Sequence, residues 1–145
     1  MLSYFCGLHA ARDPSANAKG MMRCLIGQLL SQRIFDLSSL DDETVKKIKT
    51  DVKKTCDLFC QLALQLPMSS RIFCIIDTIS LYESSARKEE TLTAMRKLIR
   101  LAGKLKNRVC LRLLVTAPGR SLEVTNEVDF DEILDLPDDR DLTIW

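Results

Sequence analysis

One carboxylate stands out in this sequence because of the residues that precede it. Asp77 directly follows an unbroken apolar run, Ile-Phe-Cys-Ile-Ile, at residues 72–76. Such a run, without polar alternation, is typical of a strand buried on both faces of a parallel sheet. The carboxyl edge of such a sheet is where α/β proteins bind ligands. Because a buried carboxylate needs a partner, we expect Asp77 to hold Mg²⁺, to act in catalysis, or to cap the next turn through Thr78 or Ser80.

The cysteines and lysines give weaker signals. The six cysteines lack the paired spacing of a zinc site, and the single histidine, His9, does not complete one. We therefore expect ordinary cysteine packing in a reducing cytoplasm, with Cys56 and Cys60 on one helix face. Five lysines between residues 46 and 54 would suit a phosphate polymer or a solvated helix face. Without interleaved aromatic residues, we expect the solvated face.

Charge is balanced over the 145 residues but unevenly distributed. The formal net charge of +1 gives no overall attraction to nucleic acid or to a membrane. Residues 87–120 hold ten lysines and arginines against two glutamates, and residues 121–145 hold nine acids against Arg140. These two blocks would attract each other within the chain or mark contacts with a partner. No signal peptide and no apolar run of about 20 residues is present, so we expect a cytoplasmic protein.

The elements that position Asp77 follow from hydrophobic periodicity. Apolar runs predict strands at residues 2–6, 72–77 and 109–116, and a shorter one at 130–136. Helical spacing predicts helices at 18–32, from 39–43 to Leu66, where Pro67 ends the pattern, and around 92–105. Alternation of this kind predicts a single α/β domain, 1–145, with three layers: a parallel sheet and helices on both faces.

Several of these segments resemble one family. Residues 2–6, the helix at residues 23–30 and the Phe73-Cys74-Ile75-Ile76-Asp77 strand resemble fungal NACHT-type P-loop NTPases of the STAND class. These are the nucleotide-binding cores of NOD-like regulators, often described as nephrocystin-like N-terminal domains. Residues 113–121 look like the family's sensor strand. The resemblance covers nearly the whole chain and implies an incomplete P-loop NTPase-like domain, from the strand after the P-loop helix through the Walker B and sensor strands.

The resemblance implies a role for three residues. Asp77 takes the position of the Walker B aspartate, which orients Mg²⁺ on the nucleotide phosphates. Thr116, at the end of the neighbouring strand, would sense the γ-phosphate. Arg120 would reach the phosphates or lie on the surface of its Pro-Gly turn. The cofactors implied are Mg²⁺ and ATP or GTP for the complete domain, and none for this chain alone.

Two departures from the family argue against catalysis. The sequence contains no G-x-x-x-x-G-K-[S/T] loop, and its five glycines are isolated. Where the family commonly adds acids after Asp77, this chain has Ile79-Ser80-Leu81. We therefore expect a fragment or degenerate form of a signalling domain, without ATP hydrolysis of its own. The alternative is a non-enzymatic regulatory module that pairs with itself or with a NOD-like relative. A phosphoacceptor receiver domain is a third reading, but the acid pair and lysine it needs are absent.

The missing P-loop strand also has a structural consequence. In the family that strand lies between the strands equivalent to residues 72–77 and 109–116. Its removal would leave a gap of about 10 Å, twice the normal strand spacing. Unpaired backbone groups along two edges cost about 1–3 kcal/mol each when buried. We expect the two strands to close the gap by pairing directly. The alternative is a slot for a strand from another chain.

Overall fold

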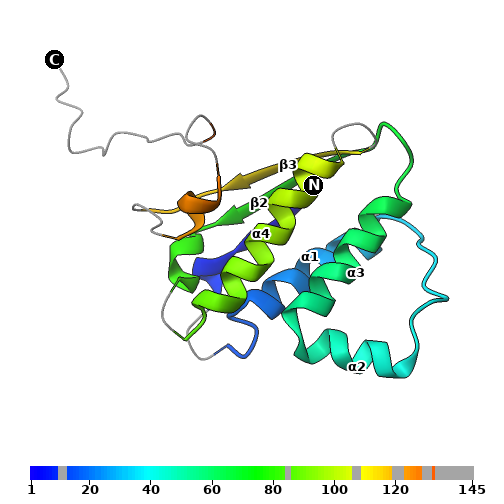
Figure 1. The fold of residues 1–145 in the computed structure, drawn as a ribbon, viewed down its shortest axis with the longest axis horizontal. Coiled ribbons are helices and arrows are strands. Elements are labelled where there is room, and N and C mark those ends of the chain that lie inside the picture. The colour runs from blue at the N-terminus through cyan, green and yellow to red at the C-terminus, as the bar shows by residue number, and fades with distance from the viewer. Residues whose placement is uncertain (10–12, 84–85, 106–108, 119–122, 129–131, 133–145) are drawn as a thin grey trace, which may run out of the picture.

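The computed structural model of the chain describes residues 1–9, 13–83, 86–105, 109–118, 123–128 and 132 (Figure 1). The element order begins β1 (Leu2–Phe5), η1 (Cys6–Leu8), α1 (Ala18–Gln32), α2 (Asp42–Thr50) and α3 (Val52–Gln65). It continues with β2 (Arg71–Asp77), η2 (Ile79–Tyr82), α4 (Lys88–Lys104), β3 (Cys110–Val115) and η3 (Val124–Glu127). The short strand predicted at 130–136 falls outside the described residues, apart from Glu132.

The three strands form one parallel sheet in the order β1-β2-β3. Each lies within one residue of the predicted bounds, so the prediction of three parallel strands is confirmed. Leu2 is opposite Cys74, and Ile75 is opposite Leu114. Since β2 bonds directly to β3, the gap expected for a missing strand is closed, and the prediction of direct pairing is confirmed.

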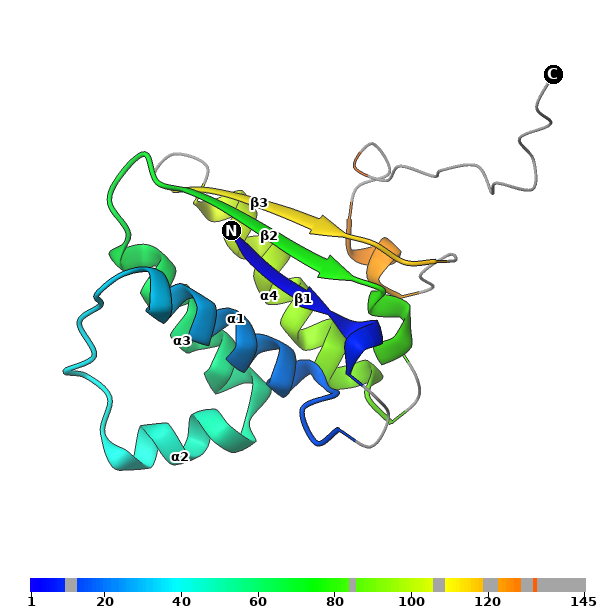
Figure 2. The ribbon, with the colours of Figure 1, turned by 180° about the vertical axis from the view of Figure 1, so that it is seen from behind.

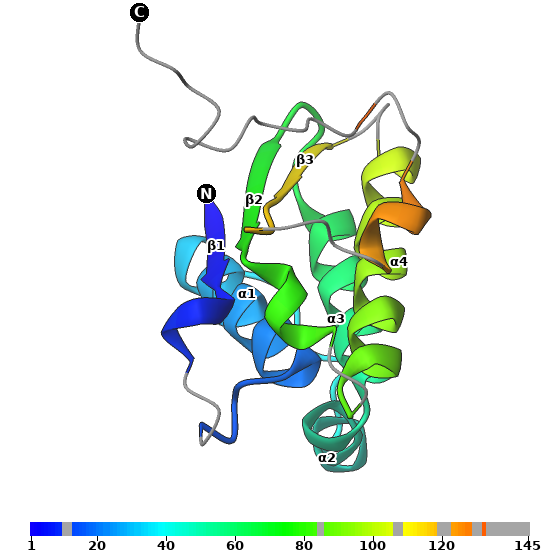
Figure 3. The same cartoon turned by 90° about the vertical axis from the view of Figure 1, so that its left-hand side faces the viewer.

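The helices that contact the sheet cover one face of it. Figures 1 and 2 show α4 on one side of the strands, and Figure 3 shows α3 and α4 together on one side of them. Burial alternates accordingly along β2, where Ile72, Cys74 and Ile76 are buried and Arg71 and Phe73 are exposed. The described chain therefore differs from the expected three layers. The apolar run suggested burial on both faces, but on its outward side Phe73 is exposed and Ile75 is only partly buried.

The core lies between the sheet and these helices. Helix α1 contacts β1 and α3, and α4 contacts β3, α3 and α1. Apolar side chains of the helices are almost completely buried, including Met21, Leu25, Phe59, Leu62 and Met95. Burying a side chain of this size stabilises the fold by about 1.5–3 kcal/mol. The sheet therefore rests on a well-packed layer, which holds the carboxyl ends of β2 and β3 in register.

The predicted helix that ends at Leu66 is two helices in the structure. Asp51 ends α2, and its side chain accepts a hydrogen bond from the Lys53 amide at 2.7 Å as the N-cap of α3. The Thr55 hydroxyl donates to the Ile48 carbonyl at 2.6 Å and so ties the two helices together. An aspartate offers the backbone a non-helical alternative, which explains the break within an otherwise continuous apolar pattern.

The outer edge of β1 is covered by a side chain. The Ser3 amide donates to Gln28 Oε1 at 2.8 Å, and Gln28 Nε2 donates to the Ser3 carbonyl at 2.7 Å. One α1 side chain thus pairs both backbone groups that a neighbouring strand would pair. Exposed strand edges are templates for association, and this amide blocks one of them.

Candidate functional site

The carboxyl ends of β2 and β3 bring Asp77 and Thr116 together. The Thr116 hydroxyl donates to Asp77 Oδ1 at 2.5 Å, and the Thr78 hydroxyl donates to Asp77 Oδ2 at 2.7 Å. The Thr116 hydroxyl oxygen also accepts a hydrogen bond from the Thr78 amide at 3.2 Å. Both carboxylate oxygens are therefore held by hydroxyl groups. We call these three side chains the Asp77 cluster.

Backbone geometry positions this cluster. The Thr116 amide donates to the Ile76 carbonyl at 2.9 Å, and the Ile79 amide donates to the Thr116 carbonyl at 3.0 Å. Between them Thr78 adopts a left-handed conformation, with φ 60° and ψ 43°. A β-branched residue rarely takes this conformation, which costs about 1–2 kcal/mol. The turn reverses the chain into η2 and directs the Thr78 hydroxyl back to the carboxylate.

The cluster favours a charged Asp77. The hydrogen bond from Thr116, followed by that from Thr78, lowers the pKa of Asp77 below its usual value. The nearby Cys6 is fully buried, and burial together with the Asp77 charge raises the pKa of its thiol to about 12. At neutral pH the cluster is therefore one carboxylate beside a protonated thiol. It offers hard oxygen atoms that can accept hydrogen bonds, and no activated sulfur nucleophile.

Oxygen atoms of this kind suit Mg²⁺, yet the surroundings do not fit a magnesium–nucleotide complex. Among the described residues, no three side chains of His, Cys, Asp or Glu gather to hold a metal ion. The place where the resemblance puts the P-loop strand, between β2 and β3, is taken by their direct pairing. Mg²⁺ in such proteins relies on substrate phosphates for much of its binding. The Asp77 carboxylate instead accepts hydrogen bonds from the Thr116 and Thr78 hydroxyl groups, and η2 has no side-chain cap.

Of the three residues singled out in the sequence, the structure places two side by side and does not describe the third. Asp77 and Thr116 are hydrogen-bonded partners, as expected for the ends of neighbouring parallel strands. Arg120 lies outside the described residues. Sequence reasoning named Thr78 only as part of a capped turn. Its left-handed backbone carries no sequence signal, because left-handed residues are usually glycine or asparagine.

A second polar cluster, which the sequence analysis did not predict, lies near the carboxyl end of β1. The Tyr4 hydroxyl is 2.8 Å from the Tyr82 hydroxyl and donates to the Ser15 carbonyl at 3.0 Å. The His9 ring stacks on Tyr4 with 4.5 Å between centroids, and His9 Nδ1 is 2.7 Å from Asp13 Oδ2. Burial raises the pKa of both tyrosines. This cluster ties η1, η2 and the loop before α1 together, and it contains no activated nucleophile.

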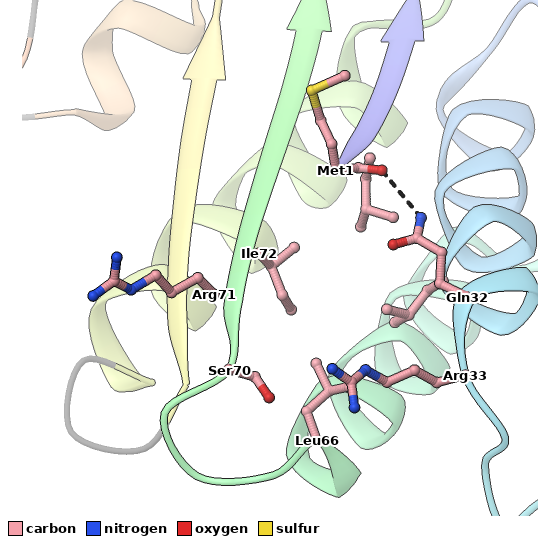
Figure 4. Close-up of a pocket in the computed structure, with 9 residues that line it drawn as sticks. Met1, Gln32, Arg33, Leu66, Ser70, Arg71 and Ile72 are labelled. Atoms are coloured by element: carbon pink, nitrogen blue, oxygen red, sulfur yellow. Dashed lines mark hydrogen bonds between the residues drawn. The ribbon is translucent and has the colours of Figure 1, made fainter.

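A small cavity opens at the opposite end of the sheet. It encloses about 100 Å³ near the start of β2, between β1, α1 and α3 (Figure 4). Gln32 Nε2 donates to the Met1 carbonyl at 3.1 Å on one side of it. Figure 4 shows Arg33 extending toward Leu66, while Arg71 extends away across β3. The cavity is far along the strands from Asp77, and the two do not form one site.

Comparisons with known proteins found no similar protein. No protein-family model, no curated protein and no solved structure matches the chain. Among the described residues, no helix is long and apolar enough to cross a membrane.

Proposed function

We propose that this chain is a degenerate NACHT-type STAND domain that acts in the cytoplasm by binding a protein and not by hydrolysing nucleotide. The observation that carries the proposal is the direct pairing of β2 with β3 beside the Asp77 cluster. The order of the resembling segments supports the family. The Asp77–Thr116 pair occupies the positions that the resemblance assigns to the Walker B and sensor residues.

The same geometry accounts for the loss of nucleotide chemistry. A phosphate loop needs successive backbone amides at the amino end of a helix, next to the Walker B strand. Here β3 pairs directly with β2, in the place that the resemblance gives to the strand carrying that loop. The two oxygens of Asp77 accept hydrogen bonds from hydroxyl groups, so the carboxylate is satisfied without a cation.

Calorimetry with ATP or GTP and Mg²⁺ tests the proposal. We expect no binding tighter than about 1 mM, which corresponds to about −4 kcal/mol. An Asp77→Ala variant should behave like the wild type, as should Asp36→Ala, a control at a distant exposed aspartate. Micromolar binding that Asp77→Ala abolishes and Asp36→Ala preserves would refute the proposal and restore the nucleotide-binding alternative.

The partner class follows from the face of the sheet that no described helix covers. Phe73 and Leu114 are exposed on neighbouring strands there. The partly exposed Ile75 lies beside Leu114 in the register and on the same face as Phe73, so the three side chains offer apolar surface to a partner. We propose a NOD-like relative with an intact phosphate loop as the partner. Titration of such a relative should give binding that Phe73→Thr weakens at least tenfold, and equal affinity for wild type and variant would remove this candidate.

A further inference from the structure

The two edges of the sheet differ in how they are covered. At β1 the amide and the carbonyl of Ser3 are both hydrogen-bonded to the side chain of Gln28. The other edge is formed by β3, which Figure 2 shows as the outermost strand. Within the described residues, no side chain forms a hydrogen bond with the backbone of β3 along this edge. Strand edges of this kind accept a further strand.

The hydrogen bonds between β2 and β3 determine which backbone groups of β3 point outward. The Thr116 amide donates to the Ile76 carbonyl at 2.9 Å, so the backbone groups of Thr116 point toward β2. Because this direction alternates along a strand, the amide and carbonyl of every second residue of β3 point away from β2. These outward residues are Leu111, Leu113 and Val115. Their backbone groups have no hydrogen-bond partner among the described residues.

The side chains of β3 also leave apolar surface at this edge. Leu113 and Val115 pack against the core, yet both are only partly buried. Leu114, which points to the opposite face, is 55% exposed, and its neighbour Arg112 is exposed as well. The strand reads CLRLLV, with one charged residue and no proline, so it has few of the features that keep strand edges apart. A further strand would bury apolar side chains and pair the backbone at the same time.

A second copy of β3 fits this edge in antiparallel orientation. A two-fold axis beside Leu113 places Leu113 opposite its own counterpart and Leu111 opposite Val115 of the second copy. In that register every outward amide and carbonyl of β3 has a partner, as in the hydrogen-bonded pairs of an antiparallel ladder. The same axis places Arg112 opposite Leu114 of the second copy. Sliding one strand by two residues would instead set the two copies of Arg112 opposite each other, and like charges in that position are destabilising.

We propose that two copies of this chain associate through their β3 edges, antiparallel about Leu113, and join their three-stranded sheets into one continuous sheet. The net charge of +1 per chain causes little repulsion between the copies. The contact uses the same strand on both copies and therefore closes at the dimer, since Gln28 covers the β1 edge of each. It involves the edge of the sheet and not the face that carries Phe73, so its failure would leave the proposed function intact.

Sedimentation velocity and hydrogen exchange of the full chain test the association. We expect a species of twice the monomer mass of 16.4 kDa at micromolar concentration, and monomers after dilution. The amides of Leu111, Leu113 and Val115 should exchange about tenfold more slowly in the dimer than in the diluted monomer. A chain that remains monomeric up to millimolar concentration would overturn the proposal. Equal protection of these amides at all concentrations would also overturn it, because the edge would then be covered within one chain.

Substitutions at the exposed Leu114 test the register without altering the core. Leu114→Lys places a second positive charge opposite Arg112 of the other copy and should weaken the dimer about tenfold. Leu114→Glu removes the same leucine but places an acid opposite that arginine, so the dimer should be as stable as that of the wild type or more stable. Arg112→Glu combined with Leu114→Lys reverses the charges of the pair and should restore the dimer.

A matched control separates the edge from a general effect of charge. Leu64→Lys makes the same substitution at an exposed leucine of α3 and should leave the dimer unchanged. Circular dichroism spectra equal to that of the wild type would show that each variant is folded. Equal weakening by Leu114→Lys and Leu114→Glu, or a dimer that neither changes, would overturn the proposal and assign the contact to another surface.

Discussion

At the scale of single residues, Asp77 shows how a carboxylate at the end of a strand is satisfied by hydrogen bonds. A carboxylate at the end of a buried strand needs either a cation or hydrogen-bond donors. In this chain Thr116 and Thr78 supply the donors, one to each oxygen. The position of Asp77 beside Thr116 was predictable, because parallel strands end at one sheet edge. The left-handed Thr78 was not, because its conformation depends on the tertiary contact with Thr116.

Thr116→Val tests the structural importance of the Asp77 cluster. Valine keeps the shape of threonine but removes the donor to Asp77 and the acceptor for the Thr78 amide. We expect a loss of about 1–2 kcal/mol in the free energy of unfolding at neutral pH, measured by urea denaturation. Thr50→Val, at the exposed end of α2, is the control and should change stability by less than about 0.5 kcal/mol.

The pH dependence of this effect has a definite sign. The hydroxyl groups lower the pKa of Asp77 in the folded state, so they stabilise the fold when the carboxylate is charged. This stability is fully present above the unfolded pKa of about 3.9 and is lost as the pH falls through the lower folded value. The difference between wild type and Thr116→Val should shrink on acidification. A constant difference would mean that the charge of Asp77 plays no part.

At the scale of elements, close packing decides where the loop before α1 lies. A Cβ added at Gly20, in the first turn of α1, would lie 2.0 Å from the Ser15 carbonyl oxygen. The same oxygen accepts hydrogen bonds from the Tyr4 hydroxyl and the Asn17 amide. The glycine therefore permits the loop to pass over the helix and reach Tyr4. The sequence predicted the helix at its exact bounds, but not this contact.

Substitution of the two glycines of α1 separates packing from helix propensity. Gly20→Ala forces the Ser15 backbone away, and we expect it to destabilise the protein by about 1–3 kcal/mol. Gly27→Ala meets no atom within 4 Å and should stabilise it by about 0.5–1 kcal/mol. Thermal or urea denaturation measures both. Stabilisation by both alanines would show that the loop yields easily and that the close approach has no energetic importance.

At the scale of the whole molecule, the sequence predicted the strands but not how many faces of the sheet are covered. An apolar run such as residues 72–76 is compatible with burial on both faces or with an apolar open face. The direct pairing of β2 with β3 was predictable from the free energy that unpaired backbone groups would cost. That prediction needs only the order of the strands in the sheet. Which face the helices cover depends on packing among α1, α3 and α4, which periodicity does not specify.

The β1 edge of the sheet is protected by the side chain of Gln28. Gln28 pairs with both backbone groups of Ser3, so its side chain occupies the place of a fourth strand at the β1 edge. Gln28→Ala removes both hydrogen bonds to Ser3 and a third, from Gln28 Nε2 to Cys24 Sγ at 3.3 Å, and it exposes the edge. We expect a loss of about 1–2 kcal/mol in the free energy of unfolding, together with concentration-dependent association through the freed edge.

Urea denaturation and sedimentation velocity measure these two effects of Gln28→Ala. Gln61→Ala, at an exposed position of α3, makes the same substitution away from the sheet and should change neither. Gln28→Glu keeps an acceptor for the Ser3 amide but loses the donor to its carbonyl, so it should fall between wild type and Gln28→Ala. Loss of stability without association would show that the charge and twist of β1 already protect the edge. Unchanged stability would mean that water replaces the glutamine at no cost.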